Sequence, residues 1–301
     1  MHISKKLLTL LLCGILCQCT PVPNLIQTPK FLPKPKPIKA PKIALVLGGG
    51  GARGMAHIGV ISVLEANHIP INLIAGTSAG SIVGALYCDR PDVSYWYDHL
   101  INLAAKDLTN WSILPRGGWD DGSKLEQYIT SQIRAKRFSE LKIPLGVLST
   151  NLNDGKPFFI RSGPIAPAVH ASSAIAGVFV PVSIYHKKLI DGSFIAPVPV
   201  KYAKQFHPRI TIAVDIDDEL LANYKKDMFS IASRAMDIVI NELTNHALRR
   251  ADVVIRPHVK TVGLFDTSHQ QDLYEEGRRA ALKQLPKILK LMQQRGIRRT
   301  A

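Results

Sequence analysis

Two segments with the same layout constrain the fold of this chain more than any other feature. In the first, residues 43–47 form a short apolar run, and a row of glycines separates it from helically spaced apolar residues over 55–66. In the second, residues 71–75 are apolar except for Asn72, and helical spacing resumes after the glycines of 76–80. Short aliphatic runs without polar alternation are typical of strands buried on both faces of a parallel sheet. The repeated order of strand, turn and helix therefore predicts an α/β fold with a mostly parallel sheet.

The remainder of the chain continues this pattern. Further strands are predicted over residues 145–149, 157–161, 209–215 and 251–257, and long helices over 229–250 and 270–294. The hydrophobic fraction of 46% is too high for a disordered chain, and no internal repeat is visible. Residues 42–301 are predicted to form one domain.

The first 19 residues are typical of an export signal. Two lysines precede an apolar run over residues 7–17, which is too short to span a bilayer and suits the core of a signal peptide. Residues 16–19 read LCQC and resemble the end of a bacterial lipoprotein signal. We expect a signal peptide over 1–19 with lipidation at Cys19, export across a bacterial inner membrane, and anchoring to a periplasmic membrane face or the cell envelope. Secretion without an anchor is the alternative.

Proline and lysine recur through residues 20–41, which predicts an extended tether between anchor and domain. The formal net charge of +15 favours an anionic partner, and an anionic membrane surface is the one we expect. We find no nucleic-acid motif and predict no nucleic-acid partner. Three of the four cysteines lie at or before position 19, so only Cys88 remains and a disulfide framework is excluded.

The first glycine turn has an anion-binding pattern without a specific nucleotide signature. Residues 49–54 read GGGARG, which contains the G-x-G-x-x-G spacing. The second strand lacks the acidic residue that a dinucleotide site needs, and the turn lacks the Gly-Lys-Ser/Thr ending of a P-loop. Free backbone N–H groups at a helix start remain, and these are suited to hold negative charge.

The second glycine turn presents a serine. Residues 76–80 read GTSAG, a G-x-S-x-G sequence between a strand and a helix. This context is typical of a nucleophile elbow, in which the turn lifts the serine hydroxyl above the sheet. The alternative is that Ser78 caps the following helix.

A serine nucleophile needs a base, and the sequence offers two kinds. His246, His258 and His269 lie late in the chain, as the histidine of a Ser-His-Asp triad would, although none is in a glycine turn. Asp191 follows an apolar approach and enters a DGS turn, where its apolar neighbours would raise its pKa. An ordinary β-turn is the alternative for that aspartate.

These motifs, in this order, resemble those of bacterial patatin-like phospholipases. The likeness includes residues 49–54, 76–80 and 171–182, and the stretch 191–200 that ends in PVPV. It implies a three-layer αβα fold with a Ser-Asp dyad at strand-to-helix turns, in which Ser78 is the nucleophile and Asp191 the base. For the other site residues it implies an oxyanion hole of Gly49, Gly50 and Gly51 with Arg53 beside it, and motif glycines Gly54, Gly76, Gly80 and Gly192. Ser193 stands where the family usually has Gly or Ala.

The resemblance implies a serine lipid acyl hydrolase that cleaves carboxylic esters of membrane phospholipids or lysophospholipids through an acyl-serine intermediate. It implies no metal or cofactor. Two other hypotheses remain open: an α/β-hydrolase-type esterase with a histidine triad, and a non-catalytic basic protein that binds a membrane surface.

Overall fold

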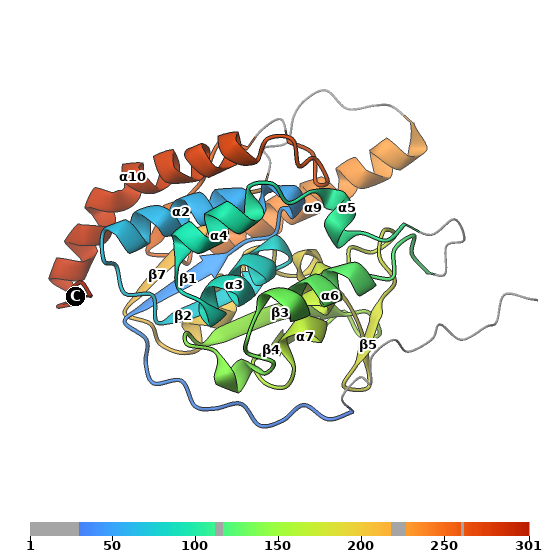
Figure 1. Ribbon diagram of the computed structural model, residues 1–301, viewed down its shortest axis with the longest axis horizontal. Helices are drawn as coiled ribbons and strands as arrows, with labels where there is room; N and C mark the ends of the chain where they lie inside the picture. Colours follow the sequence, from blue (N-terminus) through green and yellow to red (C-terminus); the bar gives the residue numbers. More distant parts are fainter. Residues whose placement is uncertain (1–29, 112–116, 218–226, 260–261, 301) are drawn as a thin grey trace, which may run out of the picture.

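A mixed sheet with β1 at its centre organises the computed structural model, which describes residues 30–111, 117–217, 227–259 and 262–300. The sheet has eight strands in the order β5-β6-β3-β2-β1-β7-β8, and β4 also pairs with β3 (Figure 1). The strands are β1 (Ile43–Leu47), β2 (Leu73–Thr77), β3 (Leu145–Asn151), β4 (Pro157–Ile160), β5 (Val182–Ile184), β6 (Lys187–Asp191), β7 (Ile210–Val214) and β8 (Val253–Ile255). The helices are α2 (Met55–Ala66), α3 (Ala79–Asp89), α4 (Val93–Leu100), α5 (Ala105–Leu108), α6 (Ser123–Gln132), α7 (Ile165–Ser173), α8 (Val200–Lys204), α9 (Met228–Leu248) and α10 (Gln270–Gln294).

The predicted parallel sheet is confirmed, and it is extended on one side by an antiparallel part. β1 runs parallel to β2 and β7, β2 to β3, and β7 to β8. The pairs β3–β4, β3–β6 and β5–β6 are antiparallel. β5 and β6 were not predicted as strands, although Asp191 ends β6.

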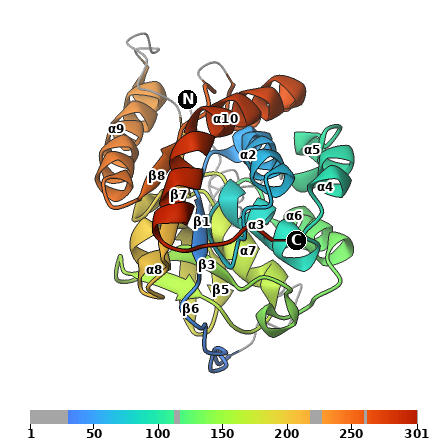
Figure 2. The same cartoon turned by 90° about the vertical axis from the view of Figure 1, so that its left-hand side faces the viewer.

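Both faces of the sheet are covered by helices, which confirms the three-layer arrangement. On β1, Ile43, Leu45 and Leu47 belong to one buried cluster, which also holds residues of α2, α3, α4, α6, α7 and α10. Ala44 and Val46 belong to a second cluster on the other face, with residues of α8 and the end of α9. Figure 2 shows the strands between these two helical layers. Because every side chain of β1 is buried, the strand carries no polar alternation.

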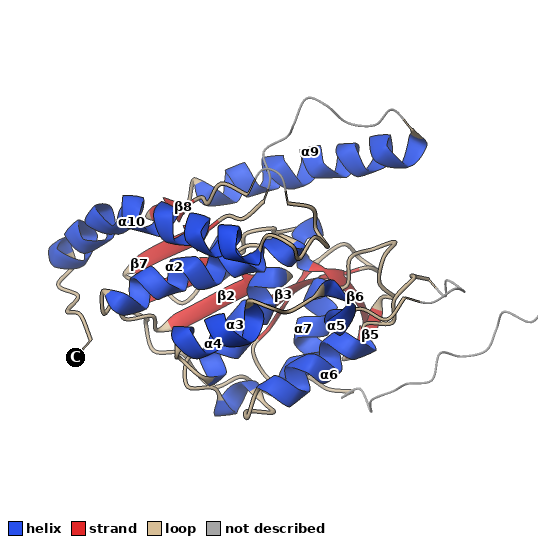
Figure 3. Ribbon diagram, turned by 45° about the horizontal axis from the view of Figure 1, so that its top comes forward, coloured by secondary structure: helices blue, strands red, loops and turns tan. Residues whose placement is uncertain are grey.

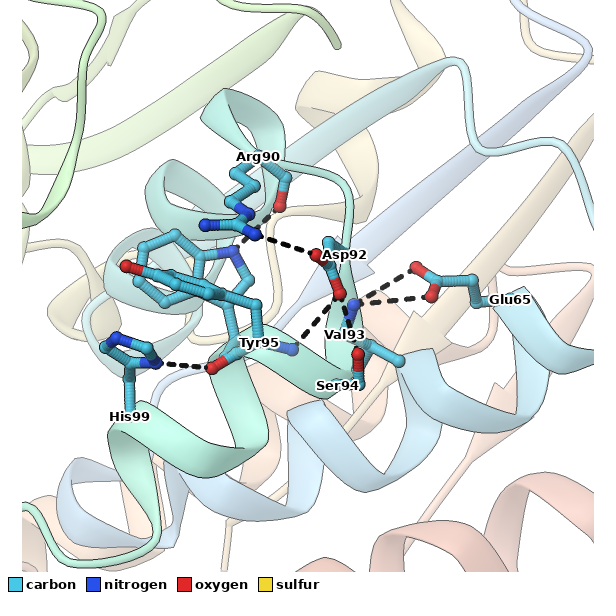
Figure 4. A network of polar contacts seen from close by, with 8 residues as sticks. Glu65, Arg90, Asp92, Val93, Ser94, Tyr95 and His99 are labelled. Carbon is cyan, nitrogen blue, oxygen red and sulfur yellow. Dashed lines mark hydrogen bonds and ion pairs between the residues drawn. The ribbon is translucent and has the colours of Figure 1, made fainter.

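A network of polar side chains fixes the start of α4 (Figure 4). Asp92 occupies the position before the helix and accepts a hydrogen bond from the Tyr95 amide at 3.1 Å. Arg90 pairs with the same carboxylate at 3.1 Å. Glu65, which lies on α2, accepts from the Val93 amide at 3.3 Å. The first turn of α4 therefore has acceptors for amides that a helix start leaves unpaired.

The signal peptide predicted over 1–19, with Cys19, lies outside the described residues. The described end of the predicted tether, residues 30–41, has no helix or strand but contacts the domain. The Pro33 carbonyl accepts from Ser162, and Lys36 donates to the Ser139 carbonyl at 2.9 Å. Across the described ranges, no helix combines the length and apolar character that a membrane span requires.

Candidate active site

The site forms where two strands end against the same edge of β3. β3 pairs with β2 along residues 145–148, with β4 along 147–150 and with β6 along 149–151. A strand has only two edges, and β4 overlaps both β2 and β6 along β3. β2 and β6 must therefore share the opposite edge, one after the other.

This register brings the predicted nucleophile and base together. β2 ends at Thr77, which pairs with Leu148. β6 runs in the opposite direction and ends at Asp191, which pairs with Ser149, the next residue of β3. Ser78 follows Thr77 directly, so the carboxyl ends of the two strands place Ser78 beside Asp191.

Ser78 has a strained backbone that its neighbours hold in place. Its φ of 51° and ψ of −124° lie in a region that costs a non-glycine residue about 1–3 kcal/mol. Its amide donates to Ser172 Oγ at 3.0 Å, and Ser172 Oγ donates in turn to the Leu148 carbonyl at 2.6 Å. Ser81 Oγ donates to the Ser78 carbonyl at 2.7 Å. These bonds fix both peptide groups of the serine.

The Ser78 hydroxyl lies close enough to the Asp191 carboxylate to lower its pKa, and it does not cap the helix that follows it. Ser78 occupies the capping position of α3, yet its side chain makes no capping hydrogen bond. Asp191 is 2% exposed, and burial is the largest influence on its pKa, which lies above the ordinary value of 3.8. Hydrogen bonds from Ser78 and Ser193 act in the opposite direction on that pKa. The desolvation expected from the apolar sequence around Asp191 is therefore present.

Backbone and side-chain contacts also orient Asp191. Its amide donates to the Ala174 carbonyl at 2.8 Å, and Thr150 Oγ1 donates to its carbonyl at 2.9 Å. The Ser193 amide donates to its Oδ1 at 2.7 Å. Ser193, the residue that departs from the family pattern, thus takes part in holding the carboxylate.

The three glycines predicted as an oxyanion hole differ in what their amides do. The Gly49 amide donates to the Pro197 carbonyl at 3.0 Å, so it is already engaged. Among the described residues, the amides of Gly50 and Gly51 have no hydrogen-bond partner. Gly51 has a φ of 58°, a left-handed conformation that glycine adopts without strain. The structure therefore leaves Gly50 and Gly51 as the amides available to an incoming oxyanion.

Arg53 fixes the peptide between these two glycines. Its side chain is 5% exposed, and its Nε donates to the Gly50 carbonyl at 3.1 Å. Its Nη1 donates to the Ile216 carbonyl at 3.3 Å and lies 3.5 Å from the Asp217 carboxylate. In a trans peptide the carbonyl and the following N–H point in opposite directions. By holding the Gly50 carbonyl, Arg53 directs the Gly51 N–H away from itself.

Close packing explains three of the four other motif glycines. A Cβ at Gly76 would collide with the Gly80 carbonyl, and one at Gly80 with the Leu47 carbonyl. A Cβ at Gly192 would collide with the Leu148 carbonyl. At Gly54 a Cβ would meet Ala79 at 3.6 Å and Val83 at 3.8 Å, which are ordinary contacts. The structure gives no steric reason for glycine at position 54.

Ser78 and Asp191 open into a cavity of about 440 Å³, a volume typical of small-molecule sites. Both residues line it, together with Arg53 and the three glycines of the first turn. Its apolar wall consists of Ile175, Ala176, Val178, Phe194, Pro197, Met236, Ile240 and Leu264. Ser193, Asp217, Ser233 and Asp237 add polar groups.

No histidine is among the described residues that line this cavity. His246 lies on α9 beside two arginines, and His269 lies near Asp266 and Asp272. His258 is exposed after β8. His57 is fully buried, and its Nε2 bonds to the Gly48 carbonyl at 2.8 Å, while burial lowers its pKa to about 4. The structure does not bring any of the three late histidines to Ser78.

The residues that could hold a metal are also dispersed. Within the described ranges, no group of three or more His, Cys, Asp or Glu side chains converges as metal ligands would.

Sequence reasoning missed several parts of the site. Ser172 supports the Ser78 amide, but a buried serine in an alanine-rich helix gives no signal of that role. Leu264 accepts a hydrogen bond from the Ala52 amide at 2.8 Å and joins the cavity from a distant loop. The α9 residues of the wall, Met236 and Ile240, belong to a helix that the pattern located but did not orient.

The fold and the site define a class: α/β proteins in which a serine at a strand-to-helix turn meets a buried aspartate from a neighbouring strand. A family model described as patatin-like phospholipase matches residues 45–204, more than half of the chain. The chain therefore belongs to the patatin-like phospholipase family.

Similar proteins include larger fungal proteins and a bacterial one. The protein named lysophospholipase nte1 of Aspergillus fumigatus is 32% identical over 179 residues, which are 58% of this chain and 12% of that protein. Lysophospholipase NTE1 of Kluyveromyces lactis is 32% identical over 223 residues, or 68% of this chain and 15% of that protein. This chain thus spans less than a sixth of either. The crystal structure of VipD from Legionella pneumophila aligns over 91% of this chain and 73% of that one, with 13% identity and a TM-score of 0.47.

Proposed function

We propose that this protein is a serine lipid acyl hydrolase that cleaves carboxylic esters of phospholipids or lysophospholipids with a Ser-Asp dyad. One observation carries the proposal: a strained serine that does not cap its helix lies beside a buried carboxylate, in a cavity lined by two glycines whose amides have no hydrogen-bond partner among the described residues. Such a serine has no structural duty that would explain its conformation.

The proposed mechanism uses only groups of this chain and water. Ser78 Oγ attacks the ester carbonyl carbon while Asp191 takes the hydroxyl proton. The amides of Gly50 and Gly51 stabilise the oxyanion, and Asp191 passes the proton to the departing alcohol. Water then attacks the acyl-serine, Asp191 takes its proton, and Ser78 is restored as the fatty acid leaves.

Burial makes this carboxylate a better base than an exposed aspartate. Its raised pKa increases its affinity for the Ser78 proton, yet the carboxylate must be ionised to accept it. The rate is therefore expected to fall when the pH is lowered through the raised pKa of Asp191. The start of α3 adds a positive dipole end close to Ser78, which favours negative charge there.

The substrate class follows from the cavity and the family. Aliphatic and aromatic side chains form most of its wall, as an acyl chain requires. The fungal relatives bear the name lysophospholipase, and the lysophospholipid alternative is proposed here on that ground.

Ester hydrolysis by single-site variants tests the proposal. The substrates are a short-chain nitrophenyl ester and a lysophosphatidylcholine, with release of nitrophenol and of fatty acid as the readouts. We expect Ser78→Ala and Asp191→Asn to abolish both activities. The matched substitutions His246→Ala, His258→Ala and His269→Ala test the triad, and we expect each to retain activity. Loss of activity in one histidine variant with retention in Asp191→Asn would contradict the dyad.

We further propose that the protein is a bacterial lipoprotein or a secreted protein, with the signal, tether and domain boundaries given above. Its support is the sequence of residues 1–41, and an anionic membrane surface suits the net charge of +15. Expression in a bacterium fed an alkyne-tagged fatty acid tests the anchor. Cys19→Ala should lose the label, while Cys17→Ala, two residues earlier, should keep it. Label that persists in Cys19→Ala would contradict this assignment.

A further inference from the structure

The first half of α9 exposes apolar side chains to solvent. α9 is the orange helix that projects at the upper right of Figure 1, and it runs along the outside of the molecule in Figure 3. Met228 is 73% exposed, and Ile231, Ile238 and Val239 are each about half exposed. Among the α9 side chains that the structure describes, the buried ones, such as Leu248, lie in the second half. A surface helix of a globular protein normally turns its apolar face inward, so this half of α9 has an apolar face that the described part of the chain leaves uncovered.

The spacing of these residues makes one face that continues into the cavity. Positions 228, 231, 235, 238 and 239 follow the i, i+3, i+4 spacing of a single helix face. Next to this face, Met236 is both 41% exposed and part of the cavity wall. Ile240 continues the wall further inward. Apolar side chains of α9 therefore reach from solvent into the wall of the cavity that holds Ser78.

Exposed apolar residues also lie on the loop that contributes Leu264 to the cavity. Leu264 is 41% exposed, lines the cavity and binds the oxyanion loop through the Ala52 amide. Phe265 follows it, and its ring contacts Trp111 edge-on at 5.9 Å. Trp111 is 55% exposed. We call this set, with the exposed α9 residues, the apolar rim: Trp111, Met228, Ile231, Met236, Ile238, Val239, Leu264 and Phe265.

We propose that the apolar rim is a docking surface for a lipid bilayer, which seats the mouth of the catalytic cavity against the membrane. The inference rests on the proposed function, because it assigns how a lipid ester reaches Ser78. With the rim inserted among lipid chains, an acyl chain passes from the bilayer to the cavity wall without contacting water.

Three observations favour a bilayer over a protein partner. Met236 and Leu264 of the rim line the cavity itself, so a second copy of the chain seated on them would block the substrate path. An exposed tryptophan among aliphatic residues is typical of surfaces at the membrane interface. Arg249 and Arg250, which directly follow α9, are exposed, and the chain carries a net charge of +15, which complements anionic headgroups.

A vesicle-binding experiment with a charged double variant of α9 tests the proposal. Ile231→Glu with Val239→Glu places two carboxylates in the rim without altering a cavity-lining residue. Binding is measured by sedimentation with vesicles of equal parts phosphatidylcholine and phosphatidylglycerol, in a Ser78→Ala background that prevents hydrolysis. Burial of two large aliphatic side chains predicts that vesicle affinity falls by about tenfold or more. In the Ser78 form, hydrolysis of vesicle phospholipid should fall in parallel, while hydrolysis of the soluble nitrophenyl ester should be unchanged.

Leu282→Glu is the matched control, because Leu282 is 49% exposed on α10, which contributes no residue to the cavity. It should bind vesicles as the parent does. Equal binding by the α9 variant and this control would overturn the proposal, as would a parent dimer that the α9 variant converts to a monomer. Absence of all ester hydrolysis would instead refute the proposed function, because vesicle binding is measured with Ser78→Ala.

Discussion

Helices α3 and α4 begin in opposite ways, although both follow a residue that can cap a helix. At α4, Asp92 has an extended φ of −154° and accepts from the Tyr95 amide. At α3, Ser78 has a φ of 51°, and its hydroxyl leaves the helix amides without a side-chain acceptor. The start of α4 has a side-chain capping hydrogen bond, whereas the start of α3 has none and contains a strained residue.

The comparison shows which of the two positions serves stability and which serves chemistry. A residue that breaks a local rule persists only where the surrounding structure holds it, and such residues concentrate at functional sites. Ser172, Ser81 and the glycines at positions 76 and 80 hold Ser78. The two aspartates follow the same division: hydrogen bonds lower the pKa of Asp92, while burial raises that of Asp191.

The largest expected effect is on catalysis at the uncapped start. Ser78→Ala should lower kcat by about 10⁴-fold or more, as removal of a nucleophile does in other serine hydrolases. Because Ser78 makes no capping bond, the free energy of unfolding should change by less than about 1 kcal/mol. Ester hydrolysis and urea unfolding measure the two quantities. A large loss of stability would show that Ser78 is a structural residue after all.

The next largest expected effect is on catalysis, through the Gly50–Gly51 peptide that Arg53 holds. Arg53→Lys keeps a cation but loses the donors to the Gly50 and Ile216 carbonyls. Misdirecting one oxyanion donor should lower kcat by about 10²-fold with little change in KM. Kinetics on the nitrophenyl ester check this, with rates normalised to folded protein. A change confined to KM would mean that Arg53 binds substrate and does not position the amide.

At the capped start, the expected effect is on stability alone. Asp92→Ala should lower the free energy of unfolding by about 1 kcal/mol, because the Tyr95 amide loses its acceptor. Ester hydrolysis should remain at the parent level. Reduced activity in a variant with unchanged stability would break the division between the two helix starts.

The smallest effect is the opposite pH dependence of the two carboxylates. The folded pKa of Asp92 is lowered, so its contribution is present above its ordinary value of 3.8 and is lost as the pH falls through the folded pKa. The folded pKa of Asp191 is raised, so the ionised carboxylate opposes folding at neutral pH.

Urea unfolding, measured from neutral to acid pH, distinguishes the two opposite effects of these carboxylates on the free energy of unfolding. Asp191→Asn should be at least as stable as the parent at pH 7, and its advantage should disappear as the pH falls below 3.8. Asp92→Ala should be less stable than the parent at pH 7, and this difference in the free energy of unfolding should disappear as the pH falls through the lowered pKa of Asp92. Parallel curves for the two variants would contradict the assigned directions.

The parts of the molecule that sequence predicted are those fixed by local pattern. The continuous apolar run of β1 and the glycines on both sides of Ser78 follow from burial and from close packing, so both were readable without a structure. The long helices α9 and α10 were also located by their spacing. The apolar approach and the DGS turn made Asp191 a candidate base, and the family resemblance paired it with Ser78, because no local pattern connects two residues more than a hundred positions apart.

The rest depends on pairing between distant segments. The β5–β6 hairpin was not predicted, because its strands are short and its antiparallel edge gives little alternation. The hydrogen bond from the Gly49 amide to the Pro197 carbonyl joins two loops that are far apart in the sequence, and no local pattern predicts it. The orientation of α9 was likewise unpredictable. The rule that apolar faces turn inward would bury the apolar side chains of its first half, and the structure exposes them.

The central claim is that the hydroxyl of Ser78 is the activated nucleophile. Incubation with a fluorophosphonate probe, followed by mass-spectrometric mapping of the modified peptide, tests it most directly. We expect a single adduct on Ser78, absent in Ser78→Ala and formed much more slowly in Asp191→Asn. An adduct on another serine, such as Ser172 or Ser193, or labelling that persists in Ser78→Ala, would contradict the claim.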